Sequence, residues 1–256
     1  MSEPLAEVAT TVTHEVGGHG ARARELDLKP SFLFYLPGVY RTLFSPSDHE
    51  KVGAYTSYGT TDVVEDTRDT LGTIGGLESQ YTQAWWINAR IVRAQGWVSH
   101  GDLLMYGASK LTYVDSVYAS STSIRNASNG GNDIASYVTN LQERYNLWRN
   151  EDRRRIAHRL AAGYLWNLAD PTLIWSVWGG IFAPLARGDR YTQMPMPTIK
   201  NLMVYPSPRF NLTPFGSEQA LDVFIARAGR GEEPHRDDGG DGALLDVYGR
   251  VGTSGL

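Results

Sequence analysis

Cysteine is absent from this chain of 256 residues, and charge is scarce. Without cysteine, neither a disulfide framework nor a cysteine-ligated zinc or iron–sulfur site can form. Charged residues make up 20% of the chain, below the roughly 25% of ordinary soluble proteins. The 24 basic and 28 acidic residues leave a net charge of -4, with no long basic stripe. A dedicated nucleic-acid-binding protein is therefore excluded, because such proteins neutralise phosphates with clustered cations.

The first residues also lack the pattern of an export signal. Residues 1–4 carry neither a basic region nor an apolar one, so the sequence as written predicts a cytoplasmic protein. Residues 161–186 form an apolar run about as long as the ~20 residues that a bilayer span needs. Asp170 and Pro171 at the centre of this run favour two buried helices that meet there. Peripheral association with a membrane is the alternative.

Aromatic residues and helical periodicity dominate what is present. The 7 tryptophans and 14 tyrosines indicate a large aromatic core. Apolar residues at helical spacing, with N-cap and glycine stop signals, indicate a mainly α fold, a helical bundle around a metal-binding helix. The expected helices cover residues 4–25, 75–96, 101–120, 132–148, 151–168 and 171–186.

Two segments break the helical pattern. Residues 26–74 are predicted to form a long irregular excursion with a short strand or hairpin, because apolar runs alternate there with Pro, Gly and Ser. A small β or extended element is predicted near residues 198–213. We expect one domain over residues 1–228, followed by a disordered tail over 229–256 that is rich in Gly and Asp.

A metal-binding pattern lies inside the first predicted helix. With no cysteine, histidines and carboxylates are the only strong ligands left for a transition metal, and His14, Glu15 and His19 fall within six residues. The histidines are five residues apart, about 140° around an ideal α-helix, so their rings would diverge. Gly17 and Gly18 lie between them. We therefore predict a π-bulge that brings both rings to one face.

This hexapeptide resembles the HEXXGH zinc motif of the dipeptidyl-peptidase III family. The matching residues are His14, Glu15, Gly18, His19 and the following Gly20. The resemblance covers the motif only, so it implies site chemistry and not a fold. It implies that His14 and His19 bind Zn²⁺ and that Glu15 is the general base that activates zinc-bound water.

The same resemblance implies a third ligand from a later helix. The corresponding residue is Glu78, 59 residues after His19, although it lacks the acidic neighbour found in the family's motif. Glu65, Asp66 and Asp69 are the alternatives.

The acid or electrophile that stabilises the oxyanion should be a Tyr, His or Arg near the cleft. Tyr81 and His100 are the candidates.

Together these patterns predict a zinc-dependent hydrolase, specifically a peptidase that acts on peptide or protein substrates. A substrate strand would pair with an edge from residues 26–74 or 198–213. Two other interpretations stay open. One is an iron or manganese enzyme with the same ligands, and the other is a non-catalytic or membrane-peripheral helical domain.

Overall fold

A computed structural model of the protein describes residues 3–34, 54–59, 66–123, 133–147, 149–188, 190–228 and 244–253. Most of these residues are helical and smaller antiparallel sheets account for much of the rest, as predicted. The helices are α1 (Glu3–Val12), the π-helix η1 (Thr13–His19), α2 (Gly20–Glu25), α4 (Asp66–Arg93), α5 (His100–Ser123), α6 (Asp133–Arg144), α7 (Asn150–Leu165), the 3-10 helix η3 (Trp166–Ala169), α8 (Pro171–Val177), the π-helix η4 (Trp178–Phe182) and α9 (Ala183–Arg187). The strands are β1 (Lys29–Phe34), β2 (Ala54–Gly59), β3 (Trp97–Ser99), β4 (Tyr191–Gln193), β5 (Thr198–Ile199), β6 (Leu202–Thr213), β7 (Gly216–Arg227) and β8 (Leu244–Thr253).

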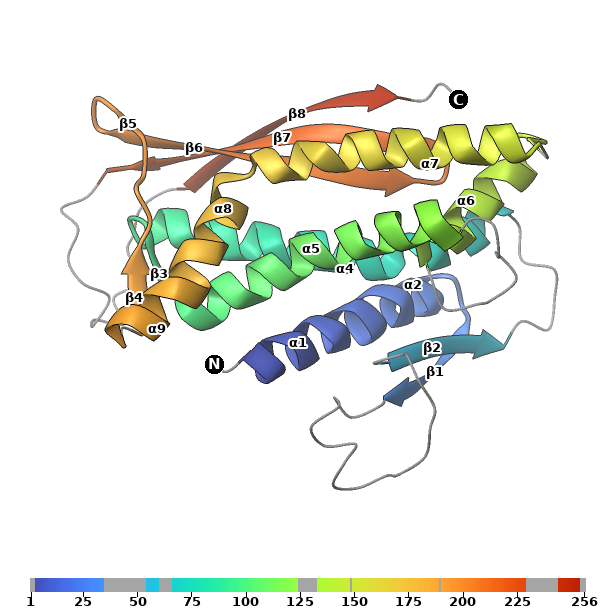
Figure 1. The fold of residues 1–256 in the computed structure, drawn as a ribbon, viewed down its shortest axis with the longest axis horizontal. Coiled ribbons are helices and arrows are strands. Elements are labelled where there is room, and N and C mark those ends of the chain that lie inside the picture. Colours follow the sequence, from blue (N-terminus) through green and yellow to red (C-terminus); the bar gives the residue numbers. More distant parts are fainter. Residues whose placement is uncertain are drawn as a thin grey trace.

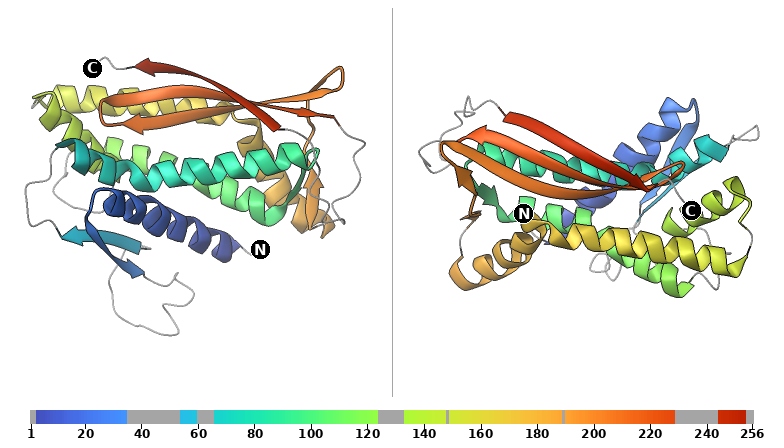
Figure 2. Two further views of the ribbon diagram at one scale, coloured as in Figure 1. Left: turned by 180° about the vertical axis from the view of Figure 1, so that it is seen from behind. Right: turned by 90° about the horizontal axis from the view of Figure 1, so that it is seen from above.

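The elements form layers around the long helix α4. A four-stranded antiparallel sheet in the order β5-β6-β7-β8 covers one side of α4 and α7 (Figure 1). On the other side, the α1–η1–α2 segment packs along α4 and α5, and the β1–β2 pair lies beyond it (Figure 2). Helix α4 therefore contacts both the sheet and the helix that carries the predicted metal ligands.

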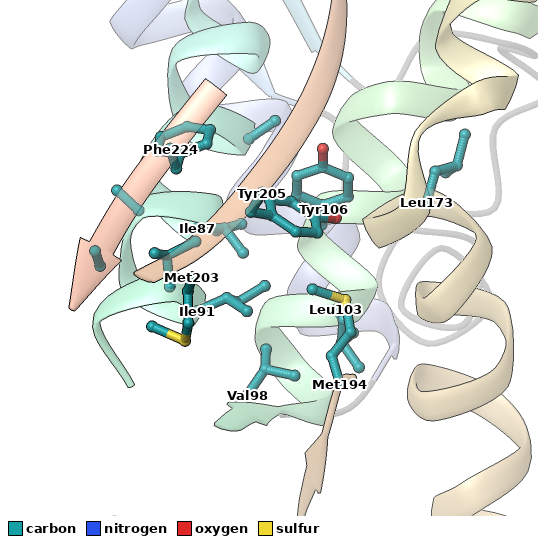
Figure 3. Close-up of a cluster of buried hydrophobic side chains, with 14 residues drawn as sticks. Ile87, Ile91, Val98, Leu103, Tyr106, Leu173, Met194, Met203, Tyr205 and Phe224 are labelled. Carbon is teal, nitrogen blue, oxygen red and sulfur yellow. The ribbon is translucent and has the colours of Figure 1, made fainter. Parts of the chain in front are cut away.

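Two apolar clusters fill the space around α4. The first joins α4, α6, α7 and β6, with Ile74, Tyr137 and Phe210 almost completely buried. The second joins the later half of α4 to α5, α8 and the sheet (Figure 3). Its side chains include Tyr106 and Phe224, each with no exposed surface. A fully buried side chain of this kind contributes roughly 1.5–3 kcal/mol, so these clusters fix α4 relative to the sheet.

The β element near residues 198–213 is confirmed and extends further than predicted. Strands β6 and β7 pair along their whole length, from Leu202 opposite Arg227 to Thr213 opposite Gly216. Buried and less buried side chains mostly alternate along β7, as expected for a strand with one face on the core. Strand β5 pairs with β6 only at Leu202 and Met203, so at Pro206 and Pro208 one edge of β6 is unpaired within the described residues. Proline is tolerated at such an edge because its missing N–H has no strand partner there.

Two predicted boundaries differ from the structure. Helix α4 begins at Asp66 and not at Gly75, so residues 66–74 at the end of the excursion are already helical. Leu244–Thr253 lies in the predicted tail but forms β8, because its alternating apolar residues pair with β7. Residues 229–243 and 254–256, the other parts of that tail, lie outside the described residues, as do 35–53 of the excursion.

Asp170 joins the last helices to the core. As predicted, it caps α8: its Oδ1 accepts a hydrogen bond of 2.9 Å from the backbone N–H of Thr172. Its Oδ2 lies 3.1 Å from Lys110 Nζ and accepts a 2.5 Å hydrogen bond from the Tyr106 hydroxyl. Burial, and next the charge of Asp170, raise the pKa of Tyr106 well above its ordinary value. The carboxylate is thus satisfied inside the protein.

The prediction that residues 161–186 form two buried helices is wrong. The two helices do meet at Asp170, but Leu165, Ile174 and Trp178 are each more than half exposed. Among the described residues, no helix has the length and apolar character needed to cross a bilayer.

Candidate metal centre

The two motif histidines share a π-helix, as the sequence predicted. Residues Thr13–His19 form η1, and the backbone N–H of Gly20 donates to the carbonyl of Glu15 five residues earlier. This i→i+5 pattern returns the fifth residue to the same face of the helix. His14 Nε2 and His19 Nε2 consequently lie 3.1 Å apart, with their rings nearly perpendicular at 76°.

Glycines allow α4 to cross this π-helix at backbone contact. A Cβ at Gly18 would lie 2.5 Å from the carbonyl oxygen of Gly75, which real side chains essentially never approach so closely. A Cβ at Gly76 would lie 2.6 Å from His19 Nε2. The pair Gly75-Gly76 therefore does not mark the start of a helix. It leaves room for the two imidazoles in the middle of α4.

Asp133 is the third residue of the cluster, and sequence reasoning missed it as a ligand. It is the first residue of α6, and its Oδ2 lies 2.8 Å from His14 Nε2 and 3.1 Å from His19 Nε2. The three atoms form a compact triangle that satisfies the spacing of a metal site. The only sequence feature that marks Asp133 is its place at the start of a predicted helix. Acidic residues are common there because they interact favourably with the helix dipole, so this place does not indicate a ligand.

The spacing of these three atoms is close to that of ligands around a tetrahedral metal ion. Nitrogen and oxygen ligands at about 2.0–2.2 Å from zinc lie roughly 3.3 Å from one another. The observed separations of 2.8–3.1 Å are slightly shorter and are hydrogen-bond distances. Two histidines and one carboxylate also leave a coordination position for water or substrate, which catalytic sites need.

Electrostatics in the cluster favours a cation. Burial alone would lower the pKa of His19, but the hydrogen bond and negative charge of Asp133, the Gly72 carbonyl and the charge of Glu15 together raise it to about 9. Burial alone would raise the pKa of Asp133, but its contacts with the two histidines hold it well below the ordinary range. A proton on His19 thus compensates the Asp133 carboxylate in the metal-free protein. Its stabilising effect is complete below pH about 6.5 and is lost as pH rises through about 9.

A second hydrogen bond sets the orientation of His19. Its Nδ1 lies 2.7 Å from the carbonyl oxygen of Gly72 on α4, so Nδ1 carries the proton and donates it. Nε2 is then directed to the cluster, the arrangement typical of metal-binding histidines. The Nδ1 atom of His14 is buried and has no hydrogen-bond partner among the described residues.

Glu15 lies next to the cluster and is held by the small β1–β2 sheet. Its side chain is only 8% exposed, and its Oε2 accepts a 2.5 Å hydrogen bond from the hydroxyl of Thr56 on β2. The structure thus fixes a buried carboxylate beside two histidines on one helical turn.

The structure does not bring the other predicted site residues to this cluster. Glu78, the expected third ligand, accepts hydrogen bonds of 2.6 and 2.9 Å from the guanidinium of Arg22. Tyr81 is buried and its hydroxyl accepts from Asn167, while His100 Nδ1 lies 2.5 Å from the carbonyl oxygen of Gly179.

His100 follows α4 and β3, and the part of α4 from Gly76 to Arg93 spans about 26 Å. It therefore lies at the opposite end of α4 from the cluster. Of the alternative ligands, Asp69 bonds Asn140 at 2.9 Å, Asp66 begins α4, and Glu65 lies outside the described residues.

Compared with known proteins, the chain matches no protein-family model, no curated sequence and no solved structure significantly.

Proposed function

We propose that this protein is a zinc-dependent hydrolase, and that His14, His19 and Asp133 hold the metal. The observation that carries this proposal is the convergence of three ligand atoms within 3.1 Å of one another on elements more than 110 residues apart. Asp133 takes the place that the sequence analysis gave to Glu78. In the metal-free protein a proton on His19 compensates the Asp133 carboxylate, and a bound cation would take the place of that proton.

Each residue of the site has a distinct role in the proposed hydrolysis. Zinc, when bound, lowers the pKa of a coordinated water toward 7 and polarises a carbonyl. Glu15 accepts the proton as general base, and Thr56 holds the carboxylate in place for that transfer. The Gly72 carbonyl fixes the His19 tautomer. We assign no oxyanion donor, because Tyr81 and His100 are both engaged elsewhere.

The proposed substrate is a peptide, and the resemblance to the HEXXGH motif supports this class. The β1–β2 pair also supports it, because Thr56 connects β2 directly to Glu15. Each of these two strands has one edge unpaired within the described residues. An extended peptide could add to such an edge next to the metal. The sequence predicted a substrate-binding edge from residues 26–74 or from 198–213. The β1–β2 pair belongs to the first of these segments, and it contacts the helix that carries the motif.

Metal content and peptide cleavage of matched variants test the proposal. We expect about one zinc per chain in the wild type, little in His14→Ala or Asp133→Ala, and full zinc in Glu78→Gln. Glu15→Gln should retain zinc but lose cleavage of a mixed peptide library by about 10²-fold or more. Wild-type protein that binds no zinc after supplementation would refute the metal site. Equal cleavage by wild type and Glu15→Gln would refute the role of Glu15.

A second candidate is an iron or manganese enzyme, which the donor set itself favours. Two histidines and one carboxylate with open positions also form the ligand set of non-haem iron oxygenases. The buried Glu15 next to the ligands favours hydrolysis over this alternative. Reconstitution with each metal separates the two candidates. The zinc form should cleave peptides. The iron(II) form, loaded without oxygen and then exposed to it, should not consume oxygen in the presence of peptides.

A further inference from the structure

The last helices present an apolar face to the outside of the molecule. Helix α8, η4 and α9 run continuously from Pro171 to Arg187 at one edge of the structure (Figures 1 and 2). We call their outward side chains the apolar face, and they are 44–82% exposed. The apolar face consists of Ile174, Val177, Trp178, Ile181, Phe182 and Leu185.

The inward side of the same helix carries small residues. Thr172, Ser176, Gly179, Gly180 and Ala183 are all buried. Leu173 is also buried and Trp175 is partly buried, so small residues make up most of the inward side but not all of it. An ordinary surface helix instead turns most of its large apolar side chains to the core and polar ones to water. Small residues inside and large apolar residues outside are typical of helices that pack against protein on one side and lipid on the other.

The apolar face is continuous and uncharged. Among the described residues, 20 large hydrophobic side chains are exposed, and 9 of them fall within residues 165–185. The six of the apolar face follow helical spacing on one side of a continuous helix, so they are not scattered singly. Residues 171–186 contain no charged side chain. Trp178 and Phe182 lie one turn apart with ring centroids separated by 6.2 Å. Their exposed halves alone offer roughly 200 Å² of apolar surface.

The surroundings of the apolar face favour lipid over a protein partner. A protein interface of useful size has a polar rim with hydrogen bonds around its apolar centre, and this face has no polar side chain over residues 177–186. Arg187 and the exposed Arg190 follow the face, with Asp189 between them in the sequence, so residues 187–190 carry a net charge of +1. Cations beside exposed Trp and Phe are the pattern by which helices lie in the headgroup region of anionic membranes. We propose that the apolar face lies on the surface of a lipid bilayer, with the helix parallel to it.

Vesicle co-sedimentation of the full chain tests this proposal. Vesicles of phosphatidylcholine alone and of phosphatidylcholine with phosphatidylglycerol serve as probes. We expect wild type to bind both, and the anionic vesicles more tightly. Trp178→Gln should weaken binding about tenfold, and Leu185→Gln similarly, because each removes a side chain from the apolar phase. Arg187→Gln should reduce binding to the anionic vesicles only, by about fivefold.

Trp86→Gln is the matched control. Trp86 on α4 is 53% exposed, the same fraction as Trp178, but lies outside the apolar face. The Trp86→Gln protein should bind vesicles like wild type. All variants should keep the wild-type melting temperature. Glu15→Gln should bind like wild type, which separates this proposal from the hydrolase. Absence of wild-type binding, equal losses in Trp86→Gln and Trp178→Gln, or a dimer that Trp178→Gln dissociates would overturn the lipid assignment.

Discussion

Gly17 and Gly18 are adjacent in the motif but have different surroundings. A Cβ at Gly17 would meet only Thr13 Cγ2, at 4.0 Å, and the residue is exposed. A Cβ at Gly18 would overlap the backbone of α4. Each glycine destabilises a helix by about 1 kcal/mol relative to alanine. The structure therefore requires glycine at position 18, where α4 crosses, but not at position 17.

Alanine substitutions separate these two glycines. Gly17→Ala should raise the free energy of unfolding by about 0.5–1 kcal/mol, because alanine is the better helix former and has room. Gly18→Ala should lower it by roughly 1–3 kcal/mol, because the crossing helices must move apart. Urea unfolding of both variants provides the measurement. Similar changes in the two would mean that the backbone crossing does not require glycine.

At the scale of elements, the metal would connect the start of α6 to η1. Asp133 is the first residue of α6, and its contacts with His14 and His19 span more than 110 residues of chain. A ligand that binds only the folded state stabilises it by about 2.7 kcal/mol when the free ligand concentration is 100 times the dissociation constant. Metal removal should therefore loosen α6 as well as η1.

Chelation tests this link. Removing zinc should lower the melting temperature of the wild type and of Glu78→Gln, but should leave His14→Ala and Asp133→Ala unchanged, because these variants have no metal to lose. Hydrogen exchange should increase in the first turn of α6 after chelation. If exchange increases only in η1, Asp133 is not a ligand.

The sequence predicted local elements well and their distant contacts poorly. The spacing of His14 and His19 with two glycines between them was enough to predict η1, and Asp170-Pro171 was enough to predict the start of α8. Asp133 could not be found, because a single acidic residue at a helix start carries no mark of a partner more than 110 residues away. Glu78, chosen by resemblance, pairs instead with Arg22.

The start of α4 illustrates a second limit of sequence reasoning. Gly75-Gly76 looks like a helix entry, since glycines disfavour helix interiors by about 1 kcal/mol each. In the structure these glycines are buried where η1 crosses α4. Tertiary packing therefore outweighs the local preference, and a single sequence does not reveal which glycines lie at such a crossing.

At the scale of the whole molecule, α4 separates two regions with different proposed roles. The metal centre lies near Gly76, and the opposite end of α4 leads through β3 to α5, against which the inward sides of α8 and η4 pack. Between them lies the Asp170 carboxylate, which joins α5, α8 and β6 through Lys110, Tyr106 and Ser207. The layers of the molecule meet at this buried charge.

Lys110→Met measures how strongly the layers depend on this pair. Lys110 and Asp170 are 3% and 0% exposed, so the substitution leaves a buried carboxylate without its cation. Removing one partner of a buried ion pair costs about 3–5 kcal/mol, whereas replacing both by neutral groups costs far less. We expect a loss of that size in urea unfolding, and recovery of more than half of it in Lys110→Met with Asp170→Asn, which keeps the α8 cap.

Arg90→Met provides the comparison for an exposed pair. Arg90 lies 2.6 Å from Asp102, a shorter separation than that of the buried pair, but its side chain is 58% exposed. Water solvates both charges there, so this loss should stay below about 1 kcal/mol. Equal losses in Lys110→Met and Arg90→Met would show that the buried pair contributes no more to stability than the exposed one. The core would then be held by the apolar clusters on either side of Asp170, and its carboxylate would contribute only the cap of α8.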